Sequence, residues 1–174
     1  MNFELENKVA LVTGGSKNIG KEIALSLASE KVNIAFTYNS SENQAEETLN
    51  EIKKFGVQAR AYKLDISKFN ETQDVLQKIY KDFGNIDILI NNAGFTKIKK
   101  FLETNIDDWN KQIDISLKGT IYCCHLVSKK MINNQDGRII NIVGDRSRVG
   151  EANLAITAAA RGGTIAWGKS LAQE

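Results

Sequence analysis

A glycine-punctuated turn joins an apolar run at residues 8–13 to an amphipathic stretch at residues 20–30. From Thr13 to Gly20 it reads Thr-Gly-Gly-Ser-Lys-Asn-Ile-Gly, so the sequence predicts a strand that leads directly into a helix. The first N–H groups of a helix lack intrahelical acceptors, and the helix dipole adds positive potential there. The turn is therefore predicted to bind an anion such as a pyrophosphate.

The alternation of strand and helix continues along the chain. We predict strands at residues 8–13, 33–38, 58–63, 86–91 and 138–143. Several of them are apolar on both faces, which indicates a parallel sheet covered on both sides. With right-handed crossovers, this pattern predicts a doubly wound, Rossmann-like α/β fold in three layers, with a mostly parallel sheet. At 174 residues and 42% apolar content, the chain is expected to form a single domain.

Helix ends are also marked in the sequence. Ser41 with Gln44, and Thr104 with Asp107, resemble capping boxes that open helices. A longer helix is predicted to follow Thr104 and to run through Trp109, Ile113, Leu117 and Ile121. A last helix is predicted from about Leu154 to the end of the chain.

Composition argues against several classes of partner. The net charge is +2 and the basic residues are scattered among acids, so neither nucleic acid nor an anionic membrane is expected as a partner. No signal peptide or membrane-spanning run is present, and we expect a cytoplasmic protein. Cys123 and Cys124 are adjacent in a helical segment, which suits neither a disulfide framework nor a metal site, so they are predicted to be buried and no metal is expected.

Two further segments follow the third and fourth predicted strands. They read Leu-Asp-Ile-Ser from Leu64 and Asn-Asn-Ala-Gly from Asn91. Together with the glycine turn they resemble the short-chain dehydrogenase/reductase family, and the resemblance extends from about Leu5 to Glu174. It implies that the turn holds the pyrophosphate of a dinucleotide, that Asp65 contacts the adenine, and that residues 92–94 lie along the cofactor. The cofactor-binding residues expected from the resemblance are Gly14, Ser16, Lys17, Asn18, Ile19, Gly20, Asn39, Ser40, Asp65, Ile66, Asn92, Ala93 and Gly94.

Two details of this predicted site concern the choice of nucleotide and the shape of the turn. Asn18 replaces a glycine of the family pattern, and asparagine is the non-glycine residue that best tolerates a positive φ. At the end of the second strand, residues 38–40 contain no carboxylate that would repel the 2′-phosphate of NADP. With Ser16 and Lys17 as donors in the turn, the sequence favours NADP over NAD.

The resemblance also locates the positions at which the family keeps its catalytic Asn, Ser, Tyr and Lys. In this chain they are aligned with Ser116, Gly144, Thr157 and Arg161, so all of them are substituted. A threonine hydroxyl is too weak an acid to replace a phenol as proton donor, and arginine lacks the adjustable charge of lysine. The usual reaction of the family is therefore expected to be nearly silent.

Three other features leave alternatives open. Asp145 and Ser147 either take a polar role beside the nicotinamide or belong to a solvated loop. His125 is expected to pack rather than to shuttle protons. A basic stretch either attracts an acidic substrate such as an acyl thioester or is solvated; its members are Lys97, Lys99 and Lys100.

The resemblance carries expectations about the rest of the molecule. Family members continue with two strands and a substrate-covering loop, which are expected to be missing after Glu174, leaving the fifth strand as a sheet edge. The long helix and the last helix form a dimer face in the family, so a homo-oligomer is expected. Two functions remain open: an NADP(H)-dependent oxidoreductase acting on a carbonyl such as a 3-oxoacyl thioester, with an impaired or rearranged site, and a nucleotide-binding subunit without chemistry.

Overall fold

The computed structural model describes residues 3–174, which form one five-stranded sheet in the order β3-β2-β1-β4-β5. All neighbouring strands are parallel, which confirms the doubly wound fold. Each strand ends within two residues of its predicted bounds. The strands are β1 (Val9–Val12), β2 (Asn33–Tyr38), β3 (Ala59–Lys63), β4 (Ile88–Asn91) and β5 (Arg138–Asn141).

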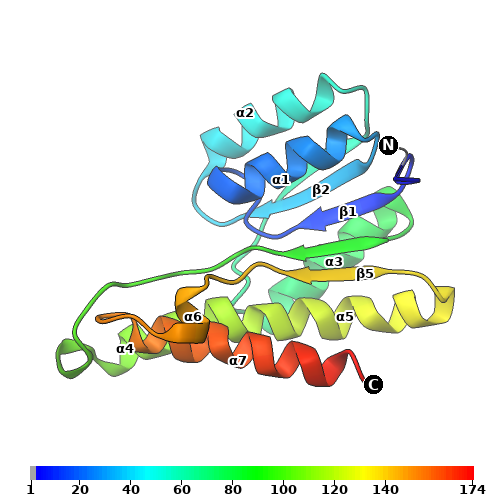
Figure 1. Ribbon diagram of the computed structural model, residues 1–174. Helices are drawn as coiled ribbons and strands as arrows, with labels where there is room; N and C mark the ends of the chain where they lie inside the picture. Colours follow the sequence, from blue (N-terminus) through cyan, green and yellow to red (C-terminus); the bar gives the residue numbers. More distant parts are fainter. Residues whose placement is uncertain (1–2) are drawn as a thin grey trace.

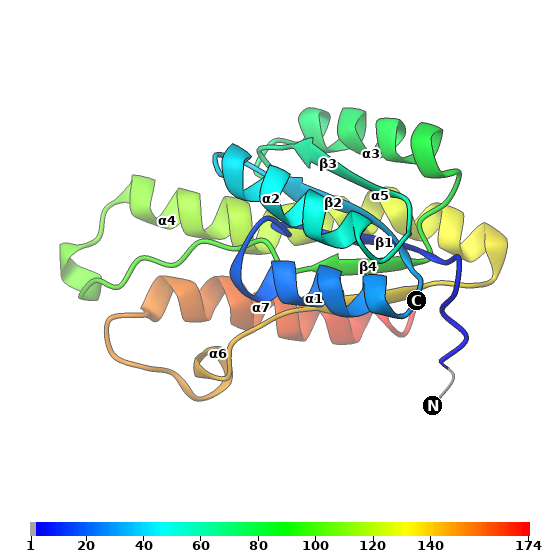
Figure 2. The same ribbon diagram turned by 90° about the horizontal axis from the view of Figure 1, so that it is seen from above.

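Helices cover both faces of the sheet, as Figure 1 shows. One layer contains α1 (Asn18–Ser29) and α2 (Glu42–Lys53), and the opposite layer contains α3 (Phe69–Phe83), α5 (Gly119–Asn134) and α7 (Ala155–Leu171). Seen from above, α4 (Ile106–Ile113) lies beyond the carboxyl ends of the strands, and the short α6 (Arg146–Val149) lies beside α7 (Figure 2). The remaining turns are the 3₁₀ turn η1 (Phe101–Glu103) and the π-helical turn η2 (Asp114–Lys118).

Successive residues of the central strands supply two separate cores. Leu11 and Leu89 pack with Val75, Ile79 and other apolar residues of the α3 and α5 layer. Their neighbours in sequence point the other way, and Val12 packs with Ala24 in the α1 and α2 layer. This alternation is the reason why β1 and β4 are apolar at nearly every position, as a parallel strand buried on both faces requires.

Two expectations about helix starts are wrong. Asn105, not Thr104, caps α4, because its side chain accepts a hydrogen bond from Asp108 N at 2.9 Å. The Thr104 hydroxyl instead donates to Phe101 O and accepts from Trp109 Nε1, both at 2.6 Å. Ser41 precedes α2, but its side chain makes no capping bond. The predicted long helix is present as α4, η2 and α5 in direct succession, with η2 as one π-helical turn inside it. The last helix, α7, agrees with the prediction.

The described residues also show which strand lies at the sheet edge and whether membrane-spanning helices or metal-binding groups are present. β5 lies at one edge of the sheet, as expected. Within residues 3–174 no helix is long and apolar enough to cross a membrane. Over the same residues no three His, Cys, Asp or Glu side chains are grouped so that they would hold a metal ion.

The two cysteines are buried and free, which confirms that prediction. Cys123 and Cys124 lie on α5 within the core shared with α3. Burial raises the pKa of Cys123 above its usual range and that of Cys124 to about 11. Both thiols are therefore protonated and poorly nucleophilic at neutral pH.

We expect neither thiol to react with Ellman's reagent in the folded protein, because both lack solvent access and thiolate character. Absorbance at neutral pH is the measurement, and the same protein in guanidinium chloride, where both thiols are exposed, is the control. Rapid stoichiometric reaction of the native chain would contradict the packing of α5.

Candidate functional site

A cleft of about 720 Å³ opens at the carboxyl ends of the strands. It is lined by the segments that follow each strand, which is where ligands of doubly wound sheets bind. Every residue that the sequence predicted to bind a cofactor lies in its wall. Of the predicted catalytic positions, Gly144, Thr157 and Arg161 line the cleft, whereas Ser116 is buried in η2 and does not.

The glycine turn has the backbone that the sequence predicted. Gly14 has φ +64°, and Asn18 has φ +50°, so asparagine occupies a left-handed conformation as expected. A Cβ on Gly20 would clash with the carbonyl oxygen of Gly14 and lie 2.5 Å from Asn92 Nδ2. Lys17 precedes α1 and makes no side-chain capping bond, which leaves the first N–H groups of α1 at the cleft.

A set of hydrogen bonds joins the end of β1 to the end of β4. The Thr13 hydroxyl accepts from Asn92 N and Ala93 N, both at 3.0 Å, and donates to Ile90 O. In return, Asn92 Nδ2 donates to Thr13 O at 3.0 Å and to Gly14 O at 3.1 Å. We call these bonds the Thr13–Asn92 clamp, and they fix the turn against the Asn-Asn-Ala-Gly segment.

Asp65 is held in the wall after β3 as a carboxylate. Its Oδ1 accepts from the Ser67 hydroxyl at 2.6 Å and from Ser67 N at 3.1 Å. These bonds, the hydroxyl one above all, lower the pKa of Asp65. Its ionised side chain lies in the cleft wall, and its contact with adenine remains a prediction.

Cations outnumber acids around the cleft. Its lining in the described part of the chain includes Lys17, Lys111, Arg146 and Arg161, but Asp65 is its one carboxylate. No ion pair within residues 3–174 involves Lys17, whereas Arg146 Nε lies 2.6 Å from Glu151 Oε2. The cleft is thus built for an anionic ligand.

The polar groups at the predicted catalytic positions are used for packing between elements. The Thr157 hydroxyl donates to Gln112 Oε1 at 2.5 Å, which ties α7 to α4. The same Gln112 oxygen accepts from Lys97 N at 3.2 Å. Ser116 Oγ accepts from Phe95 N at 3.1 Å and so ties η2 to the loop after β4.

Arg161 lies between the ends of β4 and β5. Its Nη1 donates to Ile142 O, and its Nη2 lies so close to Gly94 that a side chain there would clash. Burial lowers the pKa of Arg161 from its usual value, although an arginine stays charged at neutral pH. Gly144 is open, since a Cβ added there meets nothing within 4 Å.

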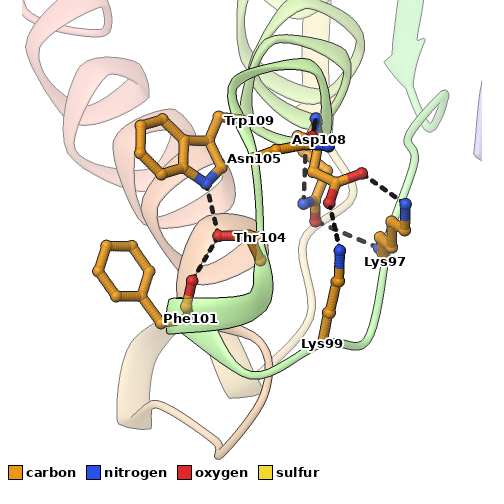
Figure 3. A network of polar contacts seen from close by, with 8 residues as sticks. Lys97, Lys99, Phe101, Thr104, Asn105, Asp108 and Trp109 are labelled. Atoms are coloured by element: carbon orange, nitrogen blue, oxygen red, sulfur yellow. Dashed lines mark hydrogen bonds and ion pairs between the residues drawn. The ribbon is translucent and has the colours of Figure 1, made fainter.

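The lysines of the basic stretch after β4 form ion pairs with carboxylates of the protein itself, two of which Figure 3 shows. Asp108 is buried, and its carboxylate oxygens lie 2.5 Å from Lys97 Nζ and 3.2 Å from Lys99 Nζ. The Lys97 bond is the main cause of the lowered pKa of Asp108. These two lysines therefore anchor the loop to α4, and Lys100 Nζ lies 4.0 Å from Glu103 Oε1.

Of the remaining candidate residues, some line the cleft and others do not. Ser147 lines the cleft and Asp145 does not. His125 is exposed beside the Phe69 ring rather than packed in a core, because it lies on the outer side of α5.

The sequence did not predict Lys111, which lines the cleft with Nζ 4.5 Å from the Phe95 ring centre. It also missed Gln112, although its place four residues before Ser116 on one helix was a usable signal.

Comparison with known proteins identifies relatives over nearly the whole chain. The family described as short chain dehydrogenase matches residues 8–174. A 3-oxoacyl-[acyl-carrier-protein] reductase FabG of Staphylococcus epidermidis is 39% identical over 171 residues, which are 97% of this chain and 69% of that protein. A 3-oxoacyl-[acyl-carrier-protein] reductase of Synechocystis sp. is 35% identical over 170 residues, 98% of this chain and 69% of that protein.

A solved structure shows the same architecture. The crystal structure of an NAD⁺-bound xylitol dehydrogenase superposes with a TM-score of 0.93 at 30% identity. The match covers 98% of this chain and 65% of the xylitol dehydrogenase chain.

We expect Asn92→Ala to lower the free energy of unfolding by about 1–3 kcal/mol, because it leaves two backbone carbonyl oxygens of the turn without their donor. Urea unfolding followed by circular dichroism measures the change. Asn50→Ala, on the exposed side of α2, is the matched control, with an expected change within about 0.5 kcal/mol. Equal stability of the two variants would mean that the clamp contributes nothing.

Proposed function

The chain belongs to the short-chain dehydrogenase/reductase family, and we propose that it is an NADP(H)-dependent oxidoreductase acting on a carbonyl or hydroxyl group, with weakened or rearranged proton transfer. One observation carries the proposal: all the residues expected to bind the coenzyme line a single cleft at the carboxyl ends of the strands. A relative of the same fold holds NAD⁺ in its crystal structure, which supports a pyridine coenzyme here.

The residues of the cleft fit such a coenzyme. The N-terminus of α1 would hold the pyrophosphate, since its N–H groups need no cationic side chain to attract an anion. Ile19 is 62% exposed in the cleft wall, an apolar surface that a bound coenzyme would cover. Lys17 and Ser40 would bind the 2′-phosphate of NADP, and Asp65 would accept from the adenine amino group. When bound, the coenzyme supplies the hydride.

Proton transfer is the weak step of this proposal. The resemblance to the family implies that Thr157 occupies the position of the tyrosine that donates the proton, and the Thr157 hydroxyl is bonded to Gln112 Oε1. An aliphatic hydroxyl is a poor acid, and positioned acid–base catalysis contributes roughly 100- to 10,000-fold to a rate. Ser147, which lines the cleft, is the residue available for a rearranged polar role.

The bond between Thr157 and Gln112 favours a second candidate function. The Thr157 hydroxyl has a structural role, because it holds α7 against α4. Such a role is expected if the chain binds a nucleotide and catalyses no hydride transfer. In that case it acts as a structural or regulatory subunit. The two candidates share the coenzyme and differ in hydride consumption.

Substrate and assembly are part of the same proposal. The names of the curated relatives support a 3-oxoacyl thioester as substrate.

We propose a homo-oligomer that pairs through α5 and α7, on the basis of the family resemblance. Sedimentation velocity tests this assembly, and a monomer at micromolar concentration would exclude it.

We expect NADPH to bind more tightly than NADH, and Lys17→Gln to reduce this preference by about tenfold, because a charge-assisted bond to phosphate is lost. Fluorescence titration with both reduced coenzymes measures the ratio of dissociation constants. Lys53→Gln, the same change at an exposed position on α2, is the control. A folded native chain that binds neither coenzyme would refute the proposed function.

We expect the quadruple variant Ser116→Asn, Gly144→Ser, Thr157→Tyr and Arg161→Lys to raise ketone reduction by roughly 100- to 10,000-fold over the native chain. The open space at Gly144 accommodates the serine. NADPH oxidation with a panel of ketones and 3-oxoacyl thioesters is the readout, and Gly144→Ser alone is the control. A native chain that already turns over, and loses activity with Ser147→Ala, would instead indicate a rearranged site.

A further inference from the structure

The inner end of the cleft contains a cation that the protein does not neutralise. A guanidinium has five N–H donors, and in Arg161 one of them, on Nη1, is used to bond Ile142 O. The remaining N–H groups have no hydrogen-bond partner within residues 3–174, and no carboxylate of these residues forms an ion pair with Arg161. Arg161 nevertheless lies half-buried in the cleft wall.

The cleft lining around Arg161 contains no acidic side chain. It is formed by residues 94–96, 111, 115, 142–144, 146, 147, 154, 157 and 161, and Asp145 of the same loop lies outside it. Lys111 adds a second cation, which contacts the Phe95 ring and no carboxylate. The backbone of Gly94 lies against Arg161 Nη2, so the absence of a side chain there gives the guanidinium its place.

Three other cations near this end of the cleft have carboxylate partners, whereas Lys111 has none among residues 3–174. Lys97 and Lys99 share the buried carboxylate of Asp108, and Arg146 pairs with Glu151. A half-buried charge without a partner is unfavourable, because the water it loses is not replaced by an opposite charge. The contrast with its neighbours indicates that the partner of Arg161 comes from outside the chain.

We propose that Arg161 binds a carboxylate of the substrate, so that this cleft selects small oxo acids or hydroxy acids over neutral carbonyl compounds, including the 3-oxoacyl thioesters that the names of the curated relatives suggest. The planar fork of free N–H groups matches a carboxylate with two parallel hydrogen bonds. This inference rests on the proposed function, because it places the substrate beside the coenzyme in one cleft.

The coenzyme itself is a poorer partner for this group. Its pyrophosphate is expected at the N-terminus of α1, after β1, whereas Arg161 lies between the ends of β4 and β5. The ribose hydroxyls near the nicotinamide are neutral and leave the charge of Arg161 uncompensated. A substrate carboxylate satisfies both the charge and the free donors.

Calorimetric titration of the full chain with 3-oxobutanoate and with its neutral methyl ester tests the proposal. The protein is saturated with NADP⁺, with which an oxo compound cannot react. We expect the acid to bind about tenfold or more tightly than the ester, as charge-assisted bonds to a carboxylate imply. Arg161→Gln should abolish this preference and leave the dissociation constant of NADP⁺ unchanged.

Two further variants control the experiment. Arg148→Gln makes the same change at an exposed residue outside the cleft lining and should keep the preference. Arg161→Lys keeps the charge without the fork and should retain part of the preference, which provides a readout if Arg161→Gln does not fold. Circular dichroism establishes the fold of each variant.

Equal affinity of the native chain for acid and ester would overturn the proposal. A loss of NADP⁺ affinity in Arg161→Gln, with the acid preference intact, would also overturn it and assign Arg161 to the coenzyme. If the native chain binds no coenzyme, the proposed function fails, and the same pair of titrations without coenzyme then decides whether Arg161 binds a carboxylate.

Discussion

The Thr13–Asn92 clamp is the interaction on which the site depends. It joins the ends of β1 and β4, two strands far apart in sequence, through the Thr13 hydroxyl and the Asn92 amide. The glycine turn is held against the amide of Asn92 so closely that Gly20 has no space for a side chain. Because this spacing is fixed before any ligand arrives, the N–H groups at the start of α1 are already directed at the cleft.

The cleft has two halves with different character. Around α1 its polar groups are free for a ligand, as with Lys17, or already ionised, as with Asp65. At the other end, the Thr157 hydroxyl holds α7 against α4, and behind the wall the Ser116 hydroxyl ties η2 to the loop after β4. Arg161 is the exception there, with donors that the protein leaves unused. This division supports the proposal that coenzyme binding is retained and proton transfer is weakened.

Local patterns were sufficient where neighbours in sequence decide the structure. The strands were predicted because apolar runs of strand length, bounded by turn residues, leave few alternatives, and the positive φ of Asn18 followed from its place in the turn. The cap of α4 was misplaced because Thr104 and Asn105 are both good caps. The indole N–H of Trp109 donates to the Thr104 hydroxyl, and Asn105 caps the helix instead. The π turn at Ser116 had no signal in the spacing of apolar residues.

By itself the sequence determined the order of strands and helices, the turn that opens α1, and the set of residues around the cleft, because each depends on periodicity or on a short motif. Only the tertiary structure decided which side chains are free to act. Lys97 and Lys99 are neutralised by a buried aspartate on another element, Thr157 is bonded to Gln112, and Arg161 has no counter-charge among residues 3–174. Such pairings arise when distant segments pack together, and no local pattern encodes them.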